Sequence, residues 1–375
     1  MKPLQGLKVV EMARILAGPW IGQALADLGA EVIKLESPDG DDTRKWGPPF
    51  IERDGDKTAA YFYAANRGKS SEIVDFRGPE GQARVRELVA DADILIENFK
   101  VGGLAKYGLD YDSLKAVNDR LIYCSITGFG QDGPYASRAG YDFLIQGMSG
   151  LMSITGEPER QPQKVGVAVT DVVTGLYGTI GILAAVEQRH HTGKGQHIDM
   201  SLLDCATALL ANQAMNYLAT DTSPNRKGNA HPNITPYQVV ETKDGHIILA
   251  VGNDGQYQRL CGVLGRGDLA EDPRYASNQA RVEHRDVLTP TLEQSTQEWT
   301  SADLLQALEA ATVPAGPINS IGDMFADPQI VARGMKITPE GVPGVRGPWK
   351  FSDAELALER TAPVLGGGSR ASDKD

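Results

Sequence analysis

Asp171 is the acidic residue whose surroundings most suggest chemistry. It follows the short apolar run VGVAVT and opens a long segment with helical periodicity. An aspartate at this place can cap a helix by accepting hydrogen bonds from its first N–H groups. Its carboxylate, stabilised as an anion by the helix N-terminus, can also act as a nucleophile toward an activated acyl group. The spacing by itself favours the cap and leaves the nucleophile open.

Three loop segments combine turn-forming residues with groups suited to an anionic ligand. Asn66-Arg67-Gly68-Lys69 places two cations in a turn after the aromatic run YFYAA. Glu97-Asn98-Phe99 ends a predicted strand and leads to the turn Gly102-Gly103, with Lys106 nearby. A second glycine-bearing loop, Gly252-Asn253-Asp254-Gly255, also follows a strand. Ligands of open α/β sheets bind at the carboxyl ends of strands. Each segment is therefore either an ordinary surface loop or part of a site for a phosphate-bearing ligand.

Several common active-site motifs are missing from the sequence. There is no GxGxxG after a strand, no Walker A sequence, no GxSxG and no HExxH, the patterns that mark several nucleotide, hydrolase and zinc sites. Gly175, Gly178 and Gly181 lie in a helical pattern with the wrong spacing for a dinucleotide motif, so we interpret them as positions of close helix packing. The three cysteines are scattered without a CxxC, so neither a metal site nor a disulfide framework is expected.

The charge balance of the chain argues against two classes of partner. Lys plus Arg number 37 and Asp plus Glu number 49, a net charge of −12. Nucleic acids and anionic membranes attract basic surfaces, so we expect neither as a partner. We find no apolar run of 18 residues and no signal peptide at the N-terminus, which predicts a cytoplasmic protein without a membrane span.

Short apolar runs alternate with helical patterns along the first half of the chain. We predict strands at 8–12, 31–35, 94–97, 121–125 and 197–201, and helices at 18–28, 79–90 and 171–191. This alternation predicts an α/β fold with a parallel sheet covered on both faces. Residues 37–60 are expected to form a long surface loop, and 221–233 a linker to a second, smaller domain. Within that domain, VVETKDGHIILAV predicts a hairpin.

A series of longer motifs occurs in a fixed order along the chain. They are ILAGPW at 15–20, LGAEVIKLE at 28–36, GDDTRKWGPPF at 40–50, NRGKSS at 66–71, ENFKVGGLAKYG at 97–108, SITGFGQDGP at 125–134, RAGYD at 138–142, TDVVTGLYG at 170–178 and HPNITPYQ at 231–238. In their order and spacing, over about residues 5–330, the chain resembles the class III CoA-transferases, the family of formyl-CoA and carnitine CoA-transferases. The resemblance favours Asp171 as a catalytic residue.

The resemblance implies a Rossmann-like large domain with a parallel sheet and a smaller α+β domain. Family members form an interlocked homodimer in which two chains thread each other. We therefore expect a large domain at 1–220, completed by about 330–375, and a small domain at 225–330. The Gly- and Pro-rich stretches 221–233 and 334–348 are expected to span open space that the second subunit threads.

The resemblance also implies which residues bind coenzyme A, held as a substrate rather than as a permanent cofactor. By their position in the motifs these are Ala17, Asn66, Arg67, Lys69, Asn98, Phe99, Lys106, Tyr107, Arg138, Tyr141, Gly252 and Gly255. We expect the phosphates on Arg67, Lys69 and Lys106. Leu16 and Ala17 are expected to face the thioester, and formyl-CoA transferases carry a glutamine at the Leu16 position. No metal ligand is implied.

The activity implied is transfer of coenzyme A from an acyl-CoA, here succinyl-CoA, to a small carboxylic acid, here a dicarboxylate. Asp171 would form a mixed anhydride and then an aspartyl-CoA thioester. Arg44 and Arg138 are the candidates for the distal carboxylate, because arginine offers a bidentate fork.

Two other functions stay open on the same residues. One is α-methylacyl-CoA racemisation, but racemases carry a histidine where this chain has Tyr141, and tyrosine is a poor base at neutral pH. The other is a non-catalytic CoA-binding protein, which requires an inert Asp171.

Overall fold

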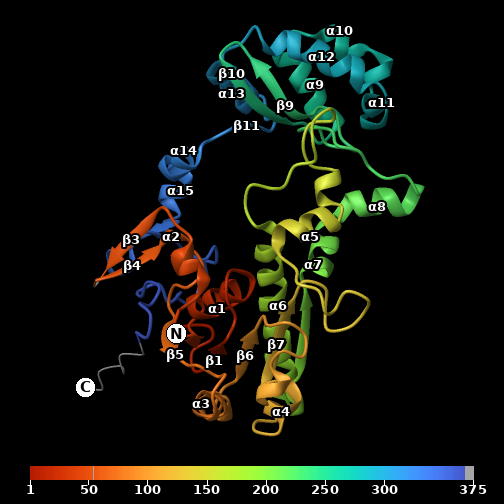
Figure 1. The fold of residues 1–375 in the computed structure, drawn as a ribbon. Helices are drawn as coiled ribbons and strands as arrows, with labels where there is room; N and C mark the ends of the chain where they lie inside the picture. Colours follow the sequence, from red (N-terminus) through yellow and green to blue (C-terminus); the bar gives the residue numbers. More distant parts are fainter. Residues whose placement is uncertain (54, 368–375) are drawn as a thin grey trace. The chain divides into compact units, whose positions relative to one another are not determined.

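The computed structural model of the chain describes residues 1–53 and 55–367. These residues divide into two compact units (Figure 1). The first contains Met1–Leu151, Lys164–Thr222 and the chain from Pro328 on, and the second contains Met152–Gln163 and Ser223–Asp327. The segment Met152–Gln163 lies outside the range 225–330 expected for the small domain. Residues 368–375, which the expected large domain includes, lie outside the described residues.

A parallel sheet of six strands forms the centre of the first unit. Its order is β5-β2-β1-β6-β7-β8, and every neighbouring pair is parallel. The strands are β1 (Lys8–Glu11), β2 (Glu31–Glu36), β5 (Ser70–Ile73), β6 (Ile94–Glu97), β7 (Ile122–Thr127) and β8 (His197–Ser201). This is the order of the doubly wound nucleotide-binding fold, in which the direction of strand addition reverses between the first and fourth strands. Here that switch point lies between β1 and β6.

Helices cover both faces of the sheet, because both odd- and even-numbered residues of the central strands are apolar and buried. Val9, Ile94 and Ile122 point to one face, where they pack with α1 (Ala17–Asp27), α6 (Val169–Thr192) and α7 (Leu202–Leu209). Their neighbours in sequence point to the other face and pack with α3 (Pro79–Ala90) and α4 (Tyr111–Lys115). The predicted α/β core is therefore confirmed.

The helices α1 and α6 lie on the same face of the sheet, although the connections that contain them lead toward opposite edges of the sheet. β2 lies on one side of β1, and β8 lies on the far side of β7. The connections β1–α1–β2 and β7–α6–β8 therefore have opposite hands, whereas nearly all such connections share one hand. Both helices begin at the carboxyl ends of their preceding strands, so their N-termini meet at one edge of the sheet.

Two glycines of α6 allow this close approach. A Cβ added to Gly175 would lie 2.9 Å from the Cβ of Trp20 and 3.1 Å from the carbonyl oxygen of Ala17. A Cβ added to Gly178 would lie 2.5 Å from the Cδ1 of Ile21. Both contacts are with α1, which confirms the packing interpretation for these two glycines.

By length and composition α6 is apolar enough to cross a membrane, a property that the core helices of soluble proteins also show. Part of this apolar character belongs to the core, since Ile182 and Ala185 are buried beside α1. Leu176, Tyr177 and Ile180 are exposed on the described chain. The helix therefore has one face in the core and another apolar face without a partner in the described residues.

The remaining elements of the first unit surround this core. They are η1 (Asp42–Lys45), β3 (Phe50–Arg53), β4 (Asp56–Ala59), α2 (Ala60–Tyr63), η2 (Ala105–Tyr107), α5 (Asp142–Met148), α8 (Ala211–Thr220), α15 (Pro328–Ala332), β12 (Lys336–Ile337), η5 (Pro339–Gly341) and β13 (Gly344–Val345). A short turn, η3 (Leu151–Ser153), lies where the chain passes to the second unit.

The second unit contains an antiparallel sheet of β9 (Tyr237–Thr242), β10 (Gly245–Ala250) and β11 (Ala315–Pro317). The predicted hairpin is confirmed as β9 and β10. Helices pack on this sheet around a separate core that includes Ile247, Leu260 and Leu304. These helices are α9 (Asp254–Val263), α10 (Gly267–Glu271), η4 (Pro273–Tyr275), α11 (Asn278–Glu283), α12 (Arg285–Thr296) and α13 (Ser301–Ala310). The unit also includes α14 (Ile321–Ala326), which contributes no buried residue to this core.

Three segments expected to be loops or linkers are more ordered than their composition indicates. Residues 37–60 contain the antiparallel pair β3–β4, and Asp41, Thr43 and Arg44 are buried there. The turn at 66–71 runs directly into edge strand β5. The stretch 334–348 forms the pair β12–β13 and supplies the carbonyl of Val345 to the Arg67 guanidinium at 2.7 Å. Buried polar contacts therefore order segments of the chain whose Gly, Pro and Asp content predicts exposed loops.

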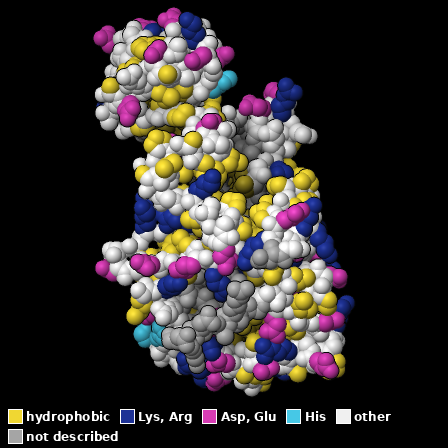
Figure 2. Space-filling view, turned by 90° about the vertical axis from the view of Figure 1, so that its left-hand side faces the viewer, with side chains coloured by type: hydrophobic (Ala, Val, Ile, Leu, Met, Phe, Trp, Pro, Cys, Tyr) yellow, Lys and Arg dark blue, Asp and Glu magenta, His cyan; other side chains and the backbone are white. Residues whose placement is uncertain are grey.

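The surface carries charges of both signs close together. On the face shown in Figure 2, Lys and Arg side chains lie interspersed with Asp and Glu. Among the described side chains of this face, neither sign forms a continuous area, and the mixture is in keeping with a chain whose net charge is −12.

The substitution Gly175→Ala is expected to lower the free energy of unfolding by about 1–3 kcal/mol, because the added methyl overpacks the contact with α1. Urea denaturation measures the change. Gly181→Ala on the same helix is the matched control, since its Cβ would lie 3.6 Å from Ile198, an ordinary contact. Alanine favours helices, so this control is expected to be neutral or more stable by up to about 1 kcal/mol. Equal losses in the two variants would contradict the packing role of Gly175.

Candidate active site

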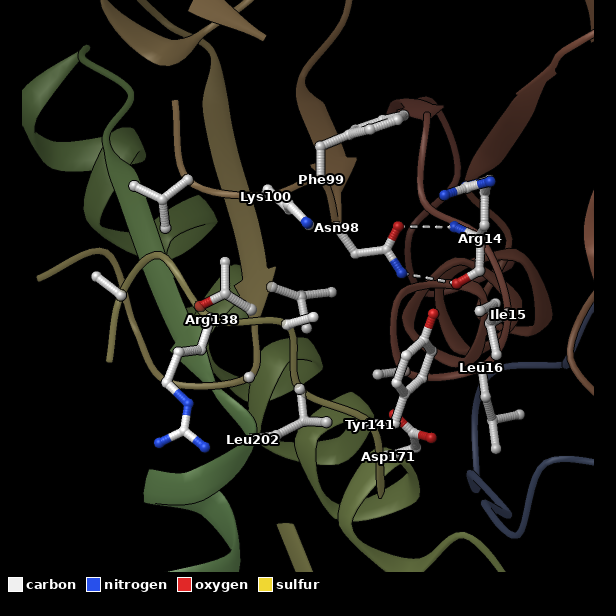
Figure 3. Close-up of a pocket in the computed structure, with 18 residues that line it drawn as sticks. Arg14, Ile15, Leu16, Asn98, Phe99, Lys100, Arg138, Tyr141, Asp171 and Leu202 are labelled. Carbon is white, nitrogen blue, oxygen red and sulfur yellow. Dashed lines mark hydrogen bonds between the residues drawn. The ribbon is translucent and has the colours of Figure 1, made fainter. Parts of the chain in front are cut away.

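A cavity of about 240 Å³ opens at the switch point of the sheet. Three chain segments form most of its wall, and each follows the carboxyl end of a strand: β1, β6 or β7. The residues that line it are Arg14, Ile15, Leu16, Ala17, Asn98, Phe99, Lys100, Val101, Ile126, Thr127, Gly128, Ala136, Arg138, Ala139, Gly140, Tyr141, Asp171 and Leu202 (Figure 3). Seven residues predicted from the sequence are thereby brought together: Leu16, Ala17, Asn98, Phe99, Arg138, Tyr141 and Asp171.

Asp171 enters the cavity from the first turn of α6. The residue that precedes the helix is Ala168, so Asp171 is the third helical residue and does not cap it. Among the described residues, no hydrogen bond or ion pair is found for its carboxylate. The cap interpretation is therefore wrong, and the carboxylate is left for another role.

The side chain that does bind the start of α6 belongs to Asp142, the first residue of α5. Its Oδ1 accepts hydrogen bonds from the backbone N–H of Thr170 at 2.8 Å and from the Thr170 hydroxyl at 2.7 Å. Its Oδ2 accepts from the amide of Gln146 at 2.8 Å. Asp142 thus fixes the position of Thr170, the residue next to Asp171. The RAGYD motif did not predict this role, because Thr170 lies 28 residues from Asp142.

The electrostatic environment of Asp171 disfavours its ionised form. Burial, followed by the negative charge of Asp142, raises the pKa of Asp171 to about 7. The phenol of Tyr61 senses the same charges, because burial and then Asp171 and Asp142 raise its pKa. Tyr61 is therefore near the acid, although its place in YFYAA gave no signal of this. A carboxyl group with a pKa near neutrality is typical of a functional site.

Arg138 and Tyr141 line the cavity from the loop before α5. The Arg138 guanidinium lies 4.5 Å from the ring centre of Tyr135 and 5.3 Å from that of Phe129. Arg138 is exposed and forms no ion pair within the described residues. Tyr141 is also exposed, at 64%. Both side chains are accessible to a ligand.

Asn98 and Phe99 form the wall that follows β6. The Asn98 side chain holds the neighbouring wall segment, because it accepts from the N–H of Arg14 at 2.9 Å and donates to its carbonyl at 2.7 Å (Figure 3). Phe99 packs edge-to-face on Phe76, which also contacts Tyr107. The exposed Lys106 ammonium lies 4.8 Å from the Tyr107 ring centre. Lys106 and Tyr107 therefore extend the aromatic wall beyond the cavity itself.

Asn66, Arg67 and Lys69 are buried, with their polar atoms bound inside the protein. Lys69 Nζ contacts Glu11 at 2.9 Å, the carbonyl of Pro19 at 2.8 Å and Asn66 at 2.8 Å. The Arg67 guanidinium binds Asp27 and the carbonyl of Val345. None of the three lines the cavity, so their contact with coenzyme A stays a prediction that these geometries do not favour.

Arg44 is bound internally in the same way. Its guanidinium forms a bidentate pair with Glu36 at 2.7 and 2.8 Å and lies 3.7 Å from the ring centre of Phe62. Of the two arginines considered for a substrate carboxylate, Arg138 alone is exposed at the cavity.

Gly252 and Gly255 belong to the second unit, at the start of α9. The Gly252 N–H donates to the side chain of Gln256 at 2.7 Å, and Asn253 caps the helix by accepting from the Gln256 N–H. A Cβ added at either glycine would make only ordinary contacts. Their predicted contact with coenzyme A stays a prediction.

The cavity brings a partly buried carboxylate, a free guanidinium and the first turn of α1 to one place. N–H groups of a first helical turn have no acceptor within the helix and can stabilise a developing oxyanion. A carboxylate beside such donors can attack an acyl group and form a covalent intermediate. The fold and site are thus suited to an α/β enzyme that acts on a small acyl compound.

Similarity to known proteins gives the family. Residues 4–369 match the model of CoA-transferase family III. The chain is 58% identical over 372 residues to the succinate–glutarate CoA-transferase of Agrobacterium fabrum, covering 97% of this chain and 93% of that protein. It is 40% identical over 376 residues to the succinyl-CoA:glutarate CoA-transferase of Mus musculus, covering 99% and 85%. A crystal structure of a CAIB/BAIF family protein from Brucella suis superposes with a TM-score of 0.89 at 63% identity, covering 98% and 97%.

The chain belongs to CoA-transferase family III. It is a class III CoA-transferase, which confirms the family predicted from the motifs, and its substrates include CoA thioesters.

Proposed function

We propose that this enzyme transfers coenzyme A from succinyl-CoA to a dicarboxylate of about the length of glutarate. The observation that carries the proposal is the carboxylate of Asp171, which lies in the switch-point cavity without a partner among the described residues. The names of the two relatives described above support the choice of donor and acceptor.

The exchange proceeds through covalent intermediates on Asp171. The carboxylate attacks the thioester carbonyl of succinyl-CoA, an aspartyl–succinyl anhydride forms, and the CoA thiolate leaves. The thiolate then attacks the aspartyl carbonyl, which gives an aspartyl-CoA thioester and releases succinate. A carboxylate of the acceptor reverses these two steps, and the product CoA ester leaves with Asp171 restored. The covalent intermediates divide one difficult exchange into easier steps.

The residues around Asp171 serve the charges of these steps. The backbone N–H groups of Ala17 and Gly18, at the start of α1, are suited to the tetrahedral oxyanions, since Pro19 has no N–H and that of Trp20 is bonded to the carbonyl of Leu16. Lys100 and Lys106 are exposed cations beside the Phe99 wall and are suited to the phosphates of coenzyme A. Arg138 is suited to the distal carboxylate of the dicarboxylate, because its guanidinium can form a bidentate pair. Coenzyme A leaves the enzyme as part of the product at the end of each cycle. It is therefore a substrate and not a permanent cofactor.

The racemase alternative is not favoured by the cavity. Its wall carries the exposed Tyr141 where racemases have a histidine, and tyrosine is a poor base near neutral pH. A non-catalytic CoA-binding protein is tested by the same variant of Asp171 as the transfer itself.

For assembly, we propose a homodimer of two interlocked chains. The apolar face of α6 is exposed at Leu176, Tyr177 and Ile180, with 61% exposure at Ile180. Helix α8 adds Met215 and Leu218, exposed at 61% and 71%. Exposed apolar surface of this extent is typical of a protein interface.

The variant Asp171→Ala is expected to abolish CoA transfer while coenzyme A still binds, because only the nucleophile is lost. Mass spectrometry of the CoA esters measures transfer, and calorimetry measures binding. Asp132→Ala, in an exposed loop residue outside the cavity, is the control and should keep wild-type turnover. One tenth of wild-type turnover in Asp171→Ala would contradict the covalent mechanism.

The pH dependence of transfer is expected to follow the ionisation of Asp171. Since the nucleophile must be deprotonated and its pKa is raised to about 7, kcat/KM should fall as the pH drops below about 7. Asp142→Asn removes a negative charge and makes the Asp171 anion easier to form, so the fall in kcat/KM should occur at a lower pH. A fall at the same pH in Asp142→Asn would show that another group limits the rate.

Arg138→Ala is expected to raise the KM for glutarate by roughly 10- to 100-fold, the loss typical of a charge-assisted hydrogen bond. The KM for butyrate, which has no distal carboxylate, should change little. Arg138→Lys should recover part of the affinity. Equal increases for glutarate and butyrate would instead assign Arg138 to coenzyme A, the other role predicted for it.

Light scattering at micromolar concentration is expected to give a mass of about twice the 40.3 kDa of one chain. Ile180→Glu and Leu218→Glu should weaken the dimer, because each places a charge on the proposed apolar interface. A mass near that of one chain for the wild-type protein would overturn the homodimer.

A further inference from the structure

Ile15, in the wall of the cavity, has a backbone conformation that β-branched residues almost never adopt. Its φ is +73°, in the left-handed region, where the Cβ crowds the backbone. It lies directly between Arg14 and the turn Leu16–Ala17, where α1 begins. Such a conformation persists only where the surrounding structure imposes it. The surroundings of residues 13–15 therefore need to account for it.

The backbone of these residues is held by side chains from three other segments. Lys34, on β2, donates to the carbonyl of Ala13 at 2.8 Å. Asn98, after β6, bonds to both the N–H and the carbonyl of Arg14. Asp41, in the loop after β2, accepts from the N–H of Ile15 at 3.2 Å. Three consecutive residues are thus fixed by contacts that no regular secondary structure provides.

Asp41 is itself held rigidly and in its ionised form. It is 1% exposed, and its carboxylate lies 3.0 Å from the Lys34 ammonium and accepts from the N–H and hydroxyl of Thr43. Its own N–H donates to Glu36 at 2.9 Å. Burial alone would raise the pKa of Asp41, but Lys34 and the Thr43 bonds outweigh it and lower the pKa. Asp41 does not line the cavity, so it acts on the site through the residues it contacts, and of these Ile15 lines the cavity.

We propose that Asp41, supported by Lys34, is a positioning residue that holds Ile15 in the left-handed conformation and thereby aims the first turn of α1 at Asp171. The inference rests on the proposed function, because it assigns a catalytic purpose to that turn. Without the Asp41 carboxylate, Ile15 relaxes toward an ordinary φ. The direction of the chain then changes one residue before Leu16, and the N–H groups at Ala17 leave the position of the oxyanion.

The test uses the substitution Ile15→Gly, because glycine at this position does not need the hydrogen bond to Asp41. Asp41→Ala is expected to lower kcat for CoA transfer by about tenfold while KM for the CoA thioester changes by less than about threefold. Glycine adopts a positive φ without strain. Asp41→Ala/Ile15→Gly should therefore recover a kcat within about threefold of Ile15→Gly alone. A merely structural role of Asp41 predicts no such rescue.

Asp39→Ala is the matched control, since Asp39 is an exposed acid in the same loop and should leave kcat unchanged. If Asp41→Ala does not fold, as judged by thermal denaturation, Asp41→Asn replaces it in the same comparison. A double variant as slow as Asp41→Ala would overturn the proposal.

A second readout keeps this inference separable from the proposed function. In crystal structures, Ile15 should leave the left-handed region in Asp41→Ala, whereas residue 15 should keep a positive φ in the double variant. An unchanged φ at Ile15 in Asp41→Ala would overturn the proposal even where transfer is active. A wild-type chain without transferase activity counts against the proposed function, and the backbone comparison then decides the role of Asp41 alone.

Discussion

The cavity depends on the contact between α1 and α6, which exists because two connections of opposite hand place both helices on one face of the sheet. Helices that begin at the carboxyl ends of parallel strands all point their N-termini to the same edge. When two of them also share a face and touch through Gly175, their first turns meet. Had α6 crossed on the face of α3 and α4, the sheet itself would separate Asp171 from Ala17. The handedness of one connection thus decides whether this site exists.

Two features of this site lower the stability of the folded protein. A helix N-terminus favours a carboxylate by roughly 0.3–1 kcal/mol, yet the pKa of Asp171 is raised to about 7, so burial and then Asp142 outweigh the helix. Ile15 adds a left-handed conformation with a cost of about 1–2 kcal/mol. Neighbouring packing and hydrogen bonds offset both, since Asp142 binds Thr170 and Asp41 binds Ile15. Strain concentrated around one cavity is the pattern expected of a functional site.

Local patterns were enough to predict several elements, and long-range pairing explains where they failed. Strand β6 and helix α3 have the predicted bounds because a short apolar run and a helical period are properties of neighbouring residues. Arg67 and Lys69 instead look like surface cations, and their burial depends on Asp27 and Glu11, which lie 40 and 58 residues away. Asp171 was recognised, but the cap interpretation could be excluded only from the structure, in which the helix begins at Val169. The contact of Asp142 with Thr170 had no local signal at all.

The distribution of cations explains how a chain with a net charge of −12 can accept an anionic thioester. Lys34, Lys69 and Arg44 are buried and paired with acidic partners, so they fix loops and contribute little field outside. Lys100, Lys106 and Arg138 are exposed, and no ion pair is found for them within the described residues. Charges beyond about 8 Å are largely screened at physiological salt, so the distant acidic groups weaken the attraction little. The proposed binding of the thioester therefore depends on the unpaired cations near the cavity rather than on the total charge.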